Sequence, residues 1–475
     1  MSCFFFRPAC LPFLLLGATF LPVAGTAHAD PYTSQRPPVE QRKFHSDAVE
    51  AQIDEVSKKI NDPELAWLFQ NCYPNTLDTT VDFTPAGADG KPDTFIITGD
   101  IDAMWLRDSS AQVDGYLPLC AKDPKLAQMV AGLIHRQAKC ILLDPYANAF
   151  YKDSSRVSQW KSDNTDMKPG VHERKYELDS LCYCIRLASK YYAVTKDAST
   201  FDDEWLSSVR LAVATMHVQQ RKTDRGPYHF TRNTETQTDT VAGAGWGNPV
   251  KPNGMICSVF RNSDDSATYL FNIPENLFAV VSLRQLASLL DATRQGSDLA
   301  TDCRALASEV EAAALKYGIV HHPKYGDIYA YECDGYGNVL LMDDAGLPSL
   351  VSIPYLGYKT TSDKVYVNTR RFALSEDNPY FQKGLIEGTG SPHTPGPRIW
   401  PMGIINRAMM SSDPAEISQC LKWLKLSSAG TGFMHESFDK DDPKQFSRVW
   451  FAWVNNLFGE LILKLAVDQP VLLEN

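Results

Sequence analysis

Residues 274–317 read PENLFAVVSLRQLASLLDATRQGSDLATDCRALASEVEAAALKY, and this stretch decides the fold class. Its first part, 274–294, opens with Pro274-Glu275, a frequent helix start, and is then apolar on nearly every side. Its second part, 298–317, is apolar on one side only. A helix that is apolar all round is buried, and a one-sided helix covers it. The stretch therefore predicts a hairpin of one inner and one outer helix.

The same pattern recurs along the whole chain. In 124–142 the apolar residues follow helical spacing: Leu126, Met129, Val130, Leu133 and Ile134. A fold dominated by α-helices, built as a toroid of concentric helix hairpins, is the architecture that such a repeat predicts. The helices expected from the sequence are 40–60, 62–71, 108–119, 124–142, 172–195, 202–221, 274–294, 298–317, 404–411, 413–427 and 447–467.

Long segments rich in Gly, Asp, Asn, Trp and Pro separate these helices. The sequence predicts loops over 143–171, 225–272, 318–402 and 428–446. Loops of this length inside a compact domain are usually functional. In a helical toroid such loops converge at one end, so we expect the functional residues there.

The first 29 residues have the pattern of a secretory signal peptide. One basic residue, Arg7, precedes an apolar run that ends in small residues around Ala27 and Ala29. The alternative, a retained signal anchor, needs a longer apolar run and a basic flank. We therefore expect a secreted protein without stable membrane insertion, with a flexible arm at 30–39 and a single catalytic domain at 40–475.

Composition narrows the function classes. The formal net charge is −11 and no basic run could track a phosphate backbone, which argues against nucleic acid as a partner. The cysteines beyond position 29 are odd in number, so at least one is unpaired in an oxidising compartment, and we expect mostly buried thiols with a few bridges. They are Cys72, Cys120, Cys140, Cys182, Cys184, Cys257, Cys303, Cys333 and Cys420.

The segment 99–116, GDIDAMWLRDSSAQVDGY, is too charged for a core and too aromatic for a solvated loop. Carboxylates and a guanidinium bind sugar hydroxyls, and an aromatic face packs on the apolar side of a pyranose. The residues that supply these groups here are Asp100, Asp102, Trp105, Arg107 and Asp108. The alternative interpretation is that Asp108, Ser109 or Ser110 caps the next helix while Arg107 pairs with an acid.

Two more segments carry candidate catalytic carboxyls. In FRNSDDSATY, 260–269, Asp264 and Asp265 are adjacent, and mutual repulsion would keep one of them protonated, as a general acid requires. The alternative is a helix N-terminus enriched in acids. In GFMHESF, 432–438, Glu436 follows a glycine-rich approach and could act as a general base on water.

The loops hold further polar residues beyond what a packed scaffold needs. Candidate substrate ligands among them are Glu332, Asp334, Asp343, Asp344, His393 and Trp400. No HExxH or other fixed histidine spacing occurs, so we expect neither a metal nor another cofactor. A GxSxG nucleophile motif is also missing from the sequence.

Several of these motifs, in this order, resemble glycoside hydrolase family 125, whose members are exo-acting α-1,6-mannosidases. They are GDIDAMWLRDSSAQ, YELDSL, FRNSDDSATY, YECDGYGN, MDDAGLPSL, GPRIWPMG, GFMHESF and VWFAWVNNLFGELI. The resemblance runs from about position 40 to the C-terminus. It implies an (α/α)6 barrel and an inverting reaction without a metal. It also implies that the general acid is Asp264 or Asp265, with Asp264 preferred, and that Glu436 is the general base.

The sequence thus predicts an inverting exo-α-1,6-mannosidase that acts on α-mannoside oligosaccharides or glycans. Asp100, Asp102, Trp105, Arg107, Asp108, His393 and Trp400 would hold the terminal mannose. One alternative is another inverting (α/α)6 glycosidase, such as a glucosidase. The other is a secreted sugar-binding protein without catalysis, which would need no opposed acid and base.

Overall fold

The computed structural model describes residues 32–474, and the chain from Ser34 onward forms one compact unit. The expected signal peptide, 1–29, lies outside the described residues. None of the helices within residues 32–474 is both long enough and apolar enough to cross a membrane. In the described part of the expected arm, Arg36 pairs with Glu50 on α1 (Asp47–Ser57) and with Asp78 on α3 (Asn75–Thr79).

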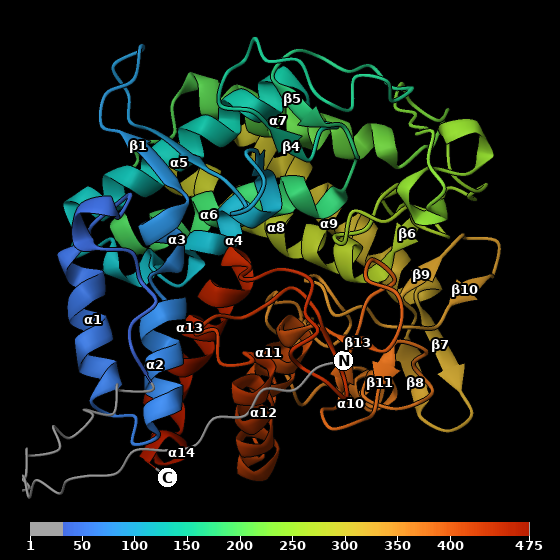
Figure 1. Ribbon diagram of the computed structural model, residues 1–475. Coiled ribbons are helices and arrows are strands. Elements are labelled where there is room, and N and C mark those ends of the chain that lie inside the picture. Colours follow the sequence, from blue (N-terminus) through green and yellow to red (C-terminus); the bar gives the residue numbers. More distant parts are fainter. Residues whose placement is uncertain (1–31, 475) are drawn as a thin grey trace, which may run out of the picture. The chain divides into compact units, whose positions relative to one another are not determined.

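The unit is a helical toroid in two layers, an (α/α)6 barrel (Figure 1). Helices α4, α6, α8, α11 and α13 make the inner layer, and α4 packs against both α6 and α13. The bounds of the inner helices are Leu106–Asp114 (α4), Leu178–Thr195 (α6), Ile273–Thr293 (α8), Pro401–Met409 (α11) and Ala452–Asp468 (α13). Those of the outer and terminal helices are Pro63–Cys72 (α2), Pro124–Leu143 (α5), Asp203–Gln219 (α7), Ser297–Tyr317 (α9), Lys364–Ala373 (α10), Pro414–Ser427 (α12) and Val471–Glu474 (α14).

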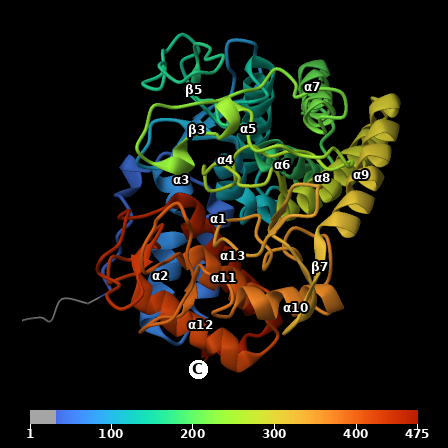
Figure 2. The ribbon, with the colours of Figure 1, turned by 90° about the vertical axis from the view of Figure 1, so that its right-hand side faces the viewer.

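The hairpin predicted from residues 274–317 is present as α8 and α9, which run side by side (Figure 2). The side chain of Asn272 accepts a hydrogen bond from the Glu275 amide at 3.0 Å and so caps α8, and Pro274 occupies its first turn. Helix α8 is buried on most sides, whereas α9 buries one stripe that includes Leu299, Cys303 and Leu306. The inner and outer assignments are therefore confirmed.

The sixth inner position holds turns instead of a regular helix. Residues 347–358 lie between α6, α8 and α11: the Tyr183 hydroxyl of α6 donates to the Leu347 carbonyl at 3.2 Å, and Arg186 of α6 donates to the Tyr355 carbonyl at 3.4 Å. Leu350 and Ile353 of this segment belong to the apolar core that also includes residues of α8. The ring of inner elements is closed by these packed turns.

Several sequence expectations are wrong in their details, and the expected helices 40–60 and 447–467 begin only at Asp47 and Ala452. The segment 318–402 is no structureless loop, because it contains α10 and seven short strands. Residues 172–177 precede α6 in extended structure, so the helix is shorter than expected. Asp108, Ser109 and Ser110 lie inside α4 and cap nothing; the helix already begins at Leu106, and both serine hydroxyls bond the Leu106 carbonyl.

Short antiparallel sheets organise the loops. The pairs β3–β4 and β4–β5 place the segment before α4 beside residues 149 and 173, and the pair β13–β14 places Arg398 and Ile399 beside Phe438 and Asp439. The strands are Val81–Thr84 (β1), Asp93–Ile96 (β2), Met104–Trp105 (β3), Ala149–Phe150 (β4), Val171–Glu173 (β5), Phe271–Asn272 (β6), Ile319–His322 (β7), Gly326–Tyr329 (β8), Glu332–Cys333 (β9), Val339–Leu340 (β10), Phe381–Gln382 (β11), Gly388–Thr389 (β12), Arg398–Ile399 (β13) and Phe438–Asp439 (β14).

The cysteines within residues 32–474 are all buried free thiols, so the few expected bridges are not formed there. Burial raises the pKa of Cys140 and of Cys420 to about 12. These thiols therefore behave as small apolar side chains of the core.

Candidate active site

A cavity of about 60 Å³, which we call the inner chamber, lies where the loops meet the inner helices. Seven of the residues that line it are candidates from the sequence: Trp105, Arg107, Asp108, Asp264, His393, Trp400 and Glu436. Other lining residues were missed as site residues: Thr98, Ile101, Asn262, Ser263, Arg448, Phe451 and Trp453. Aromatic walls around several charged groups are the composition that suits a pyranose.

A second and more open space, the outer chamber, adjoins the inner one and has a volume of about 580 Å³. The two chambers share a short set of lining residues, Ile101, Trp105, Asp264, His393 and Arg448. Glu436 lines the inner chamber and not the outer one, whereas Asp264 stands at their boundary. The two candidate catalytic carboxyls therefore occupy different places along the path of a ligand.

Asp264 adopts a left-handed backbone conformation with φ of 64°. A non-glycine residue in this region is strained, and such strain is often found at functional sites. The turn is held because the Asp264 amide donates to the Arg261 carbonyl at 2.9 Å and the Lys175 ammonium donates to the Asp264 carbonyl at 2.9 Å. Buried Lys175 thus fixes the direction in which the Asp264 carboxyl points.

Two side chains donate hydrogen bonds to the carboxyl of Asp264. Its Oδ1 accepts a hydrogen bond from Arg107 at 3.2 Å and another from Asn148 at 3.1 Å. Although burial would raise the pKa of Asp264, the hydrogen bond from Glu177 and the charges of Arg107 and Lys175 hold that pKa well below its usual range. In the resting site the carboxyl is therefore ionised.

Other groups in the inner chamber have altered protonation too. Burial raises the pKa of Asp108 to about 6, although the charge of Arg107 opposes this. Burial would lower the pKa of His393, but its contact with Asp265 and the charges of Glu436 and Asp264 raise it to about 9. His393 is therefore an imidazolium at neutral pH.

Glu436 lies just before β14, beside the strand that leads into Trp400. Its carboxylate accepts a hydrogen bond from the Ser447 hydroxyl at 3.1 Å and faces the Arg448 guanidinium at 3.3 Å. Arg448 also donates to Asp100 at 2.7 Å. A carboxylate held by two donors, with its side chain still 9% exposed, is suited to take a proton from water.

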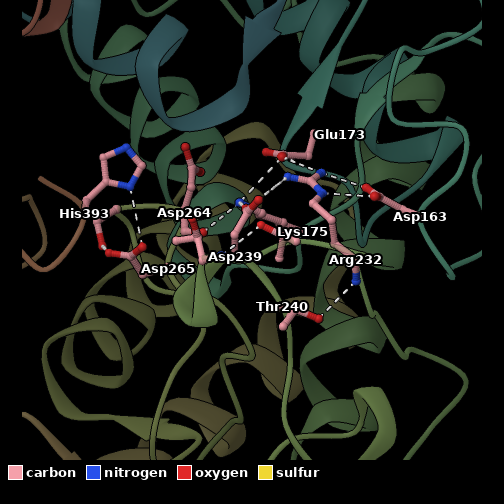
Figure 3. Close-up of polar contacts among 12 residues, drawn as sticks. Asp163, Glu173, Lys175, Arg232, Asp239, Thr240, Asp264, Asp265 and His393 are labelled. Atoms are coloured by element: carbon pink, nitrogen blue, oxygen red, sulfur yellow. Dashed lines mark hydrogen bonds and ion pairs between the residues drawn. The ribbon is translucent and has the colours of Figure 1, made fainter.

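The two candidate acids differ in their surroundings. Asp265 lines the outer chamber only, where its carboxylate accepts from the Ser263 hydroxyl at 3.3 Å and lies 3.5 Å from the His393 ring. Figure 3 shows Asp265 and His393 together on one side of Asp264. Asp265 is therefore the counter-ion of His393, and Asp264 is the carboxyl at the boundary between the chambers.

An ionic network forms one wall of the outer chamber, on the opposite side of Asp264 (Figure 3). The Arg232 guanidinium contacts Asp163 at 2.7 Å, Glu173 at 2.9 Å and Asp239 at 3.0 Å. It also lies 3.9 Å from the centre of the Trp160 ring. This network fixes the segment that carries Lys175 and thereby the strained turn at Asp264.

Several predicted ligands lie outside both chambers. Asp100 and Asp102 are exposed and pair with Arg448 and Arg156, at 2.7 Å and 2.6 Å. Four other carboxyls are bound within the scaffold: Glu332 to Arg261, Asp334 to the amides of Tyr336 and Asn338, Asp343 to those of Leu350 and Val351, and Asp344 to that of Gly346.

The sequence and the fold match those of known proteins. The model of the metal-independent alpha-mannosidases, GH125, matches residues 62–463. The chain belongs to glycoside hydrolase family 125. Over 458 residues it is 43% identical to the meiotically up-regulated gene 157 protein of Schizosaccharomyces pombe, covering 93% of this chain and 90% of that protein.

Solved structures agree with this assignment. A metal-independent α-mannosidase of Streptococcus pneumoniae, in a non-productive complex with α-1,6-mannobiose, is 39% identical with a TM-score of 0.85 and covers 90% of this chain and 100% of its own. A bacterial glucoamylase bound to acarbose shares the fold alone, with 12% identity, a TM-score of 0.54 and coverage of 88% of this chain and 59% of that chain. The predicted (α/α)6 fold of a glycoside hydrolase is thereby confirmed.

One missed site residue, Phe451, had a signal in the sequence. Phe451 and Trp453 lie in VWFAWVNN, a segment read as part of a closing helix, yet the first of them stands at the helix boundary, in the place that Trp105 and Trp400 hold before α4 and α11. An aromatic residue directly before an inner helix is thus the shared signal.

Within residues 32–474 no group of three metal-ligating side chains is placed to hold an ion.

Proposed function

We propose that this chain is an inverting, exo-acting α-1,6-mannosidase with Asp264 as general acid and Glu436 as general base. The observation that carries the proposal is the position of the two carboxyls relative to the two chambers. Asp264 stands at the boundary between the chambers, and Glu436 lines the inner chamber alone. An inverting glycosidase needs this division, because the acid must reach the oxygen that leaves while the base must reach water on the far side of the sugar.

In this mechanism the terminal mannose occupies the inner chamber and the leaving sugar occupies the outer one. Asp264 protonates the glycosidic oxygen while the bond from that oxygen to C1 breaks. A water held by Glu436 adds to the opposite face of C1 and gives its proton to Glu436, so that β-mannose is released. Trp105 and Trp400 supply apolar faces for the ring, and Asp108 and Arg448 supply polar contacts to its hydroxyls.

The relative sizes of the chambers support exo action. The inner chamber has a volume of about 60 Å³ and is bounded by the buried side chains of Arg107 and Trp453, whereas the outer chamber has about 580 Å³. The narrow inner chamber can admit no more than the end of a glycan, and the remaining glycan extends through the larger space. The α-1,6-mannobiose bound to the S. pneumoniae relative supports the linkage.

We further propose that the enzyme acts on α-1,6-linked mannosides of mannan or N-glycan origin and is secreted. Secretion is supported by the signal-peptide pattern of residues 1–29. Determination of the N-terminal sequence of the protein recovered from a secreting host tests this part. A start near Asp30 supports cleavage, and a retained Met1 contradicts it.

The decisive test of the reaction is proton NMR of the purified protein with α-1,6-mannobiose, with the α-1,2- and α-1,3-linked disaccharides as controls. Release of β-mannose first, from the 1,6-linked substrate alone, is the expected result. Release of α-mannose first contradicts inversion. Cleavage of glucosides in place of mannosides would indicate a different (α/α)6 glycosidase, and binding without cleavage would indicate a sugar-binding protein.

A further inference from the structure

Two carboxyl groups share the same donors beneath the inner chamber. Arg107 contacts Glu177 through Nη1 at 2.6 Å and Asp264 through Nη2 at 3.2 Å. The Asn148 amide donates to Glu177 at 3.3 Å and to Asp264 at 3.1 Å. Two carboxyls this close in a dry site repel each other when both are ionised, so the pair retains one proton.

The two partners differ in exposure. The side chain of Glu177 is 0% exposed and that of Asp264 is 23% exposed. Burial raises the pKa of Glu177 well above its usual range, and although Arg107 opposes this, the charge of Asp264 raises it further. The shared proton therefore rests on Glu177, while Asp264 is ionised. An ionised Asp264 has no proton for a leaving group.

The surroundings of Glu177 also suit its ionised form. Its Oε2 accepts from Arg107 at 2.6 Å and from the Ser180 hydroxyl at 2.9 Å, and its Oε1 accepts from Asn148 at 3.3 Å. Three donors can hold the negative charge once the proton has left. Glu177 can therefore exist in both protonation states without losing its place, as a proton donor to another carboxyl must.

We propose that Glu177 is a positioning residue that supplies Asp264 with the proton for the leaving sugar. This inference rests on the proposed function, in which Asp264 is the acid. The proton passes from the Glu177 carboxyl to the Asp264 carboxylate and then to the glycosidic oxygen as the bond to C1 breaks. Glu177 and Asp264 end ionised, and Glu436 ends protonated by the attacking water. Glu436 then loses its proton to solvent and Glu177 takes up a proton from solvent, which restores the resting state.

Other charged groups face the pair from every neighbouring element. Arg107 is the cation in direct contact with both carboxyls, and Lys175 and His393 act on Asp264 from the sides. The remaining acids lie around them: Asp108 on α4, Asp179 on α6, Glu173 on β5 and Glu275 on α8. Burial raises the pKa of Asp179 to about 6 and that of Glu275 well above its usual range. The excess of acids over cations favours retention of the proton.

The test compares two leaving groups. α-1,6-Mannobiose needs a proton on its leaving oxygen, whereas 2,4-dinitrophenyl α-mannoside releases a stable phenolate without one. Glu177→Gln removes the proton source and keeps the shape of the side chain. We expect kcat on mannobiose to fall by roughly 100-fold or more, as loss of general acid catalysis does, while the rate on the dinitrophenyl substrate changes only a few-fold.

Asp343→Asn is the matched control, because Asp343 is a buried carboxyl that is bound to the amides of Leu350 and Val351 and lines neither chamber. It should alter the two rates by the same factor. Equal losses on both substrates in Glu177→Gln would overturn the proposal and indicate a structural role, and so would an unchanged rate on mannobiose.

If Glu177→Gln does not fold, Glu177→Asp is measured, because it withdraws the carboxyl by one methylene. It should slow mannobiose more than the dinitrophenyl substrate, and an equal effect on both overturns the proposal. Failure of the proposed function is recognised separately, since the wild-type protein would then cleave neither substrate or would release α-mannose.

Discussion

Glu436→Gln tests the base at the centre of the proposed mechanism. The substitution keeps the size of the side chain and removes the basic oxygen. Loss of a general base costs about 10²- to 10⁴-fold in rate. At about 1.36 kcal/mol for each tenfold step, this equals roughly 3 to 5.5 kcal/mol of transition-state stabilisation. The structure predicts a smaller effect on substrate binding, because the Glu436 carboxylate is held by Ser447 and Arg448 and the amide oxygen of Gln can keep one of these contacts.

The assay separates catalysis from binding. Release of mannose from α-1,6-mannobiose gives kcat, and calorimetry with a mannose-shaped iminosugar gives Kd. We expect kcat to fall 100-fold or more while Kd changes by no more than about tenfold, since the amide keeps a neutral hydrogen bond and such a bond is worth about 0.5 to 1.5 kcal/mol. Asp439→Asn is the control, because Asp439 lies on β14 nearby and bonds only the amides of residues 441 and 442.

Chemical rescue of the variant also tests the stereochemistry of the reaction. Azide needs no general base, so it should restore turnover of an activated mannoside in Glu436→Gln and give β-mannosyl azide. A variant that keeps more than a tenth of the wild-type kcat would refute the assignment of Glu436. Formation of the α-azide would refute the inverting geometry.

Four further predictions concern binding, protonation, stability and metal independence. Trp105→Ala removes a 6% exposed ring that lines both chambers and should weaken an iminosugar inhibitor roughly 10- to 100-fold, measured as its Ki. The raised pKa of His393 stabilises the folded site most fully below about 6.5, and this contribution is lost as the pH rises through about 9, so its ring signals in NMR should titrate near pH 9. Leu286→Ala in the fully buried part of α8 should lower the free energy of unfolding by about 2 to 5 kcal/mol in denaturant titrations. Prolonged treatment with a chelator should leave kcat unchanged, and a loss that added metal restores would contradict this.

The helices could be predicted from the sequence because their patterns are local. The apolar sides of 274–294 and 298–317 determine which helix is inner and which is outer, and no distant information is needed. The sixth inner element could not be predicted in this way, because residues 347–358 are held by partners far along the chain, such as Tyr183 and Arg186. Turns supported by such contacts have no periodic signal.

The candidate site was only partly predictable for the same reason. Trp105, Arg107 and Asp108 reach the inner chamber, because one short segment carries them into a helix start. Asp100 lies only five to eight positions before these three residues, yet its partner is Arg448, which is 348 positions along the chain. Composition could indicate that carboxylates and guanidinium groups would meet, but which ones meet depends on the closed ring of helices.

The direction of the inner helices connects the fold with the chemistry. Trp105, Glu177, Trp400 and Phe451 stand at the N-caps of α4, α6, α11 and α13, and none of these helix starts has a side-chain cap. Their N-terminal ends, which carry partial positive charge, therefore converge on the chambers that hold the ionised carboxyls. A barrel with this orientation stabilises negative charge at one end and brings the residue before each helix into the site. The same feature explains why the aromatic residues directly before α4, α11 and α13, which are Trp105, Trp400 and Phe451, line the inner chamber that Asp264 and Glu436 share.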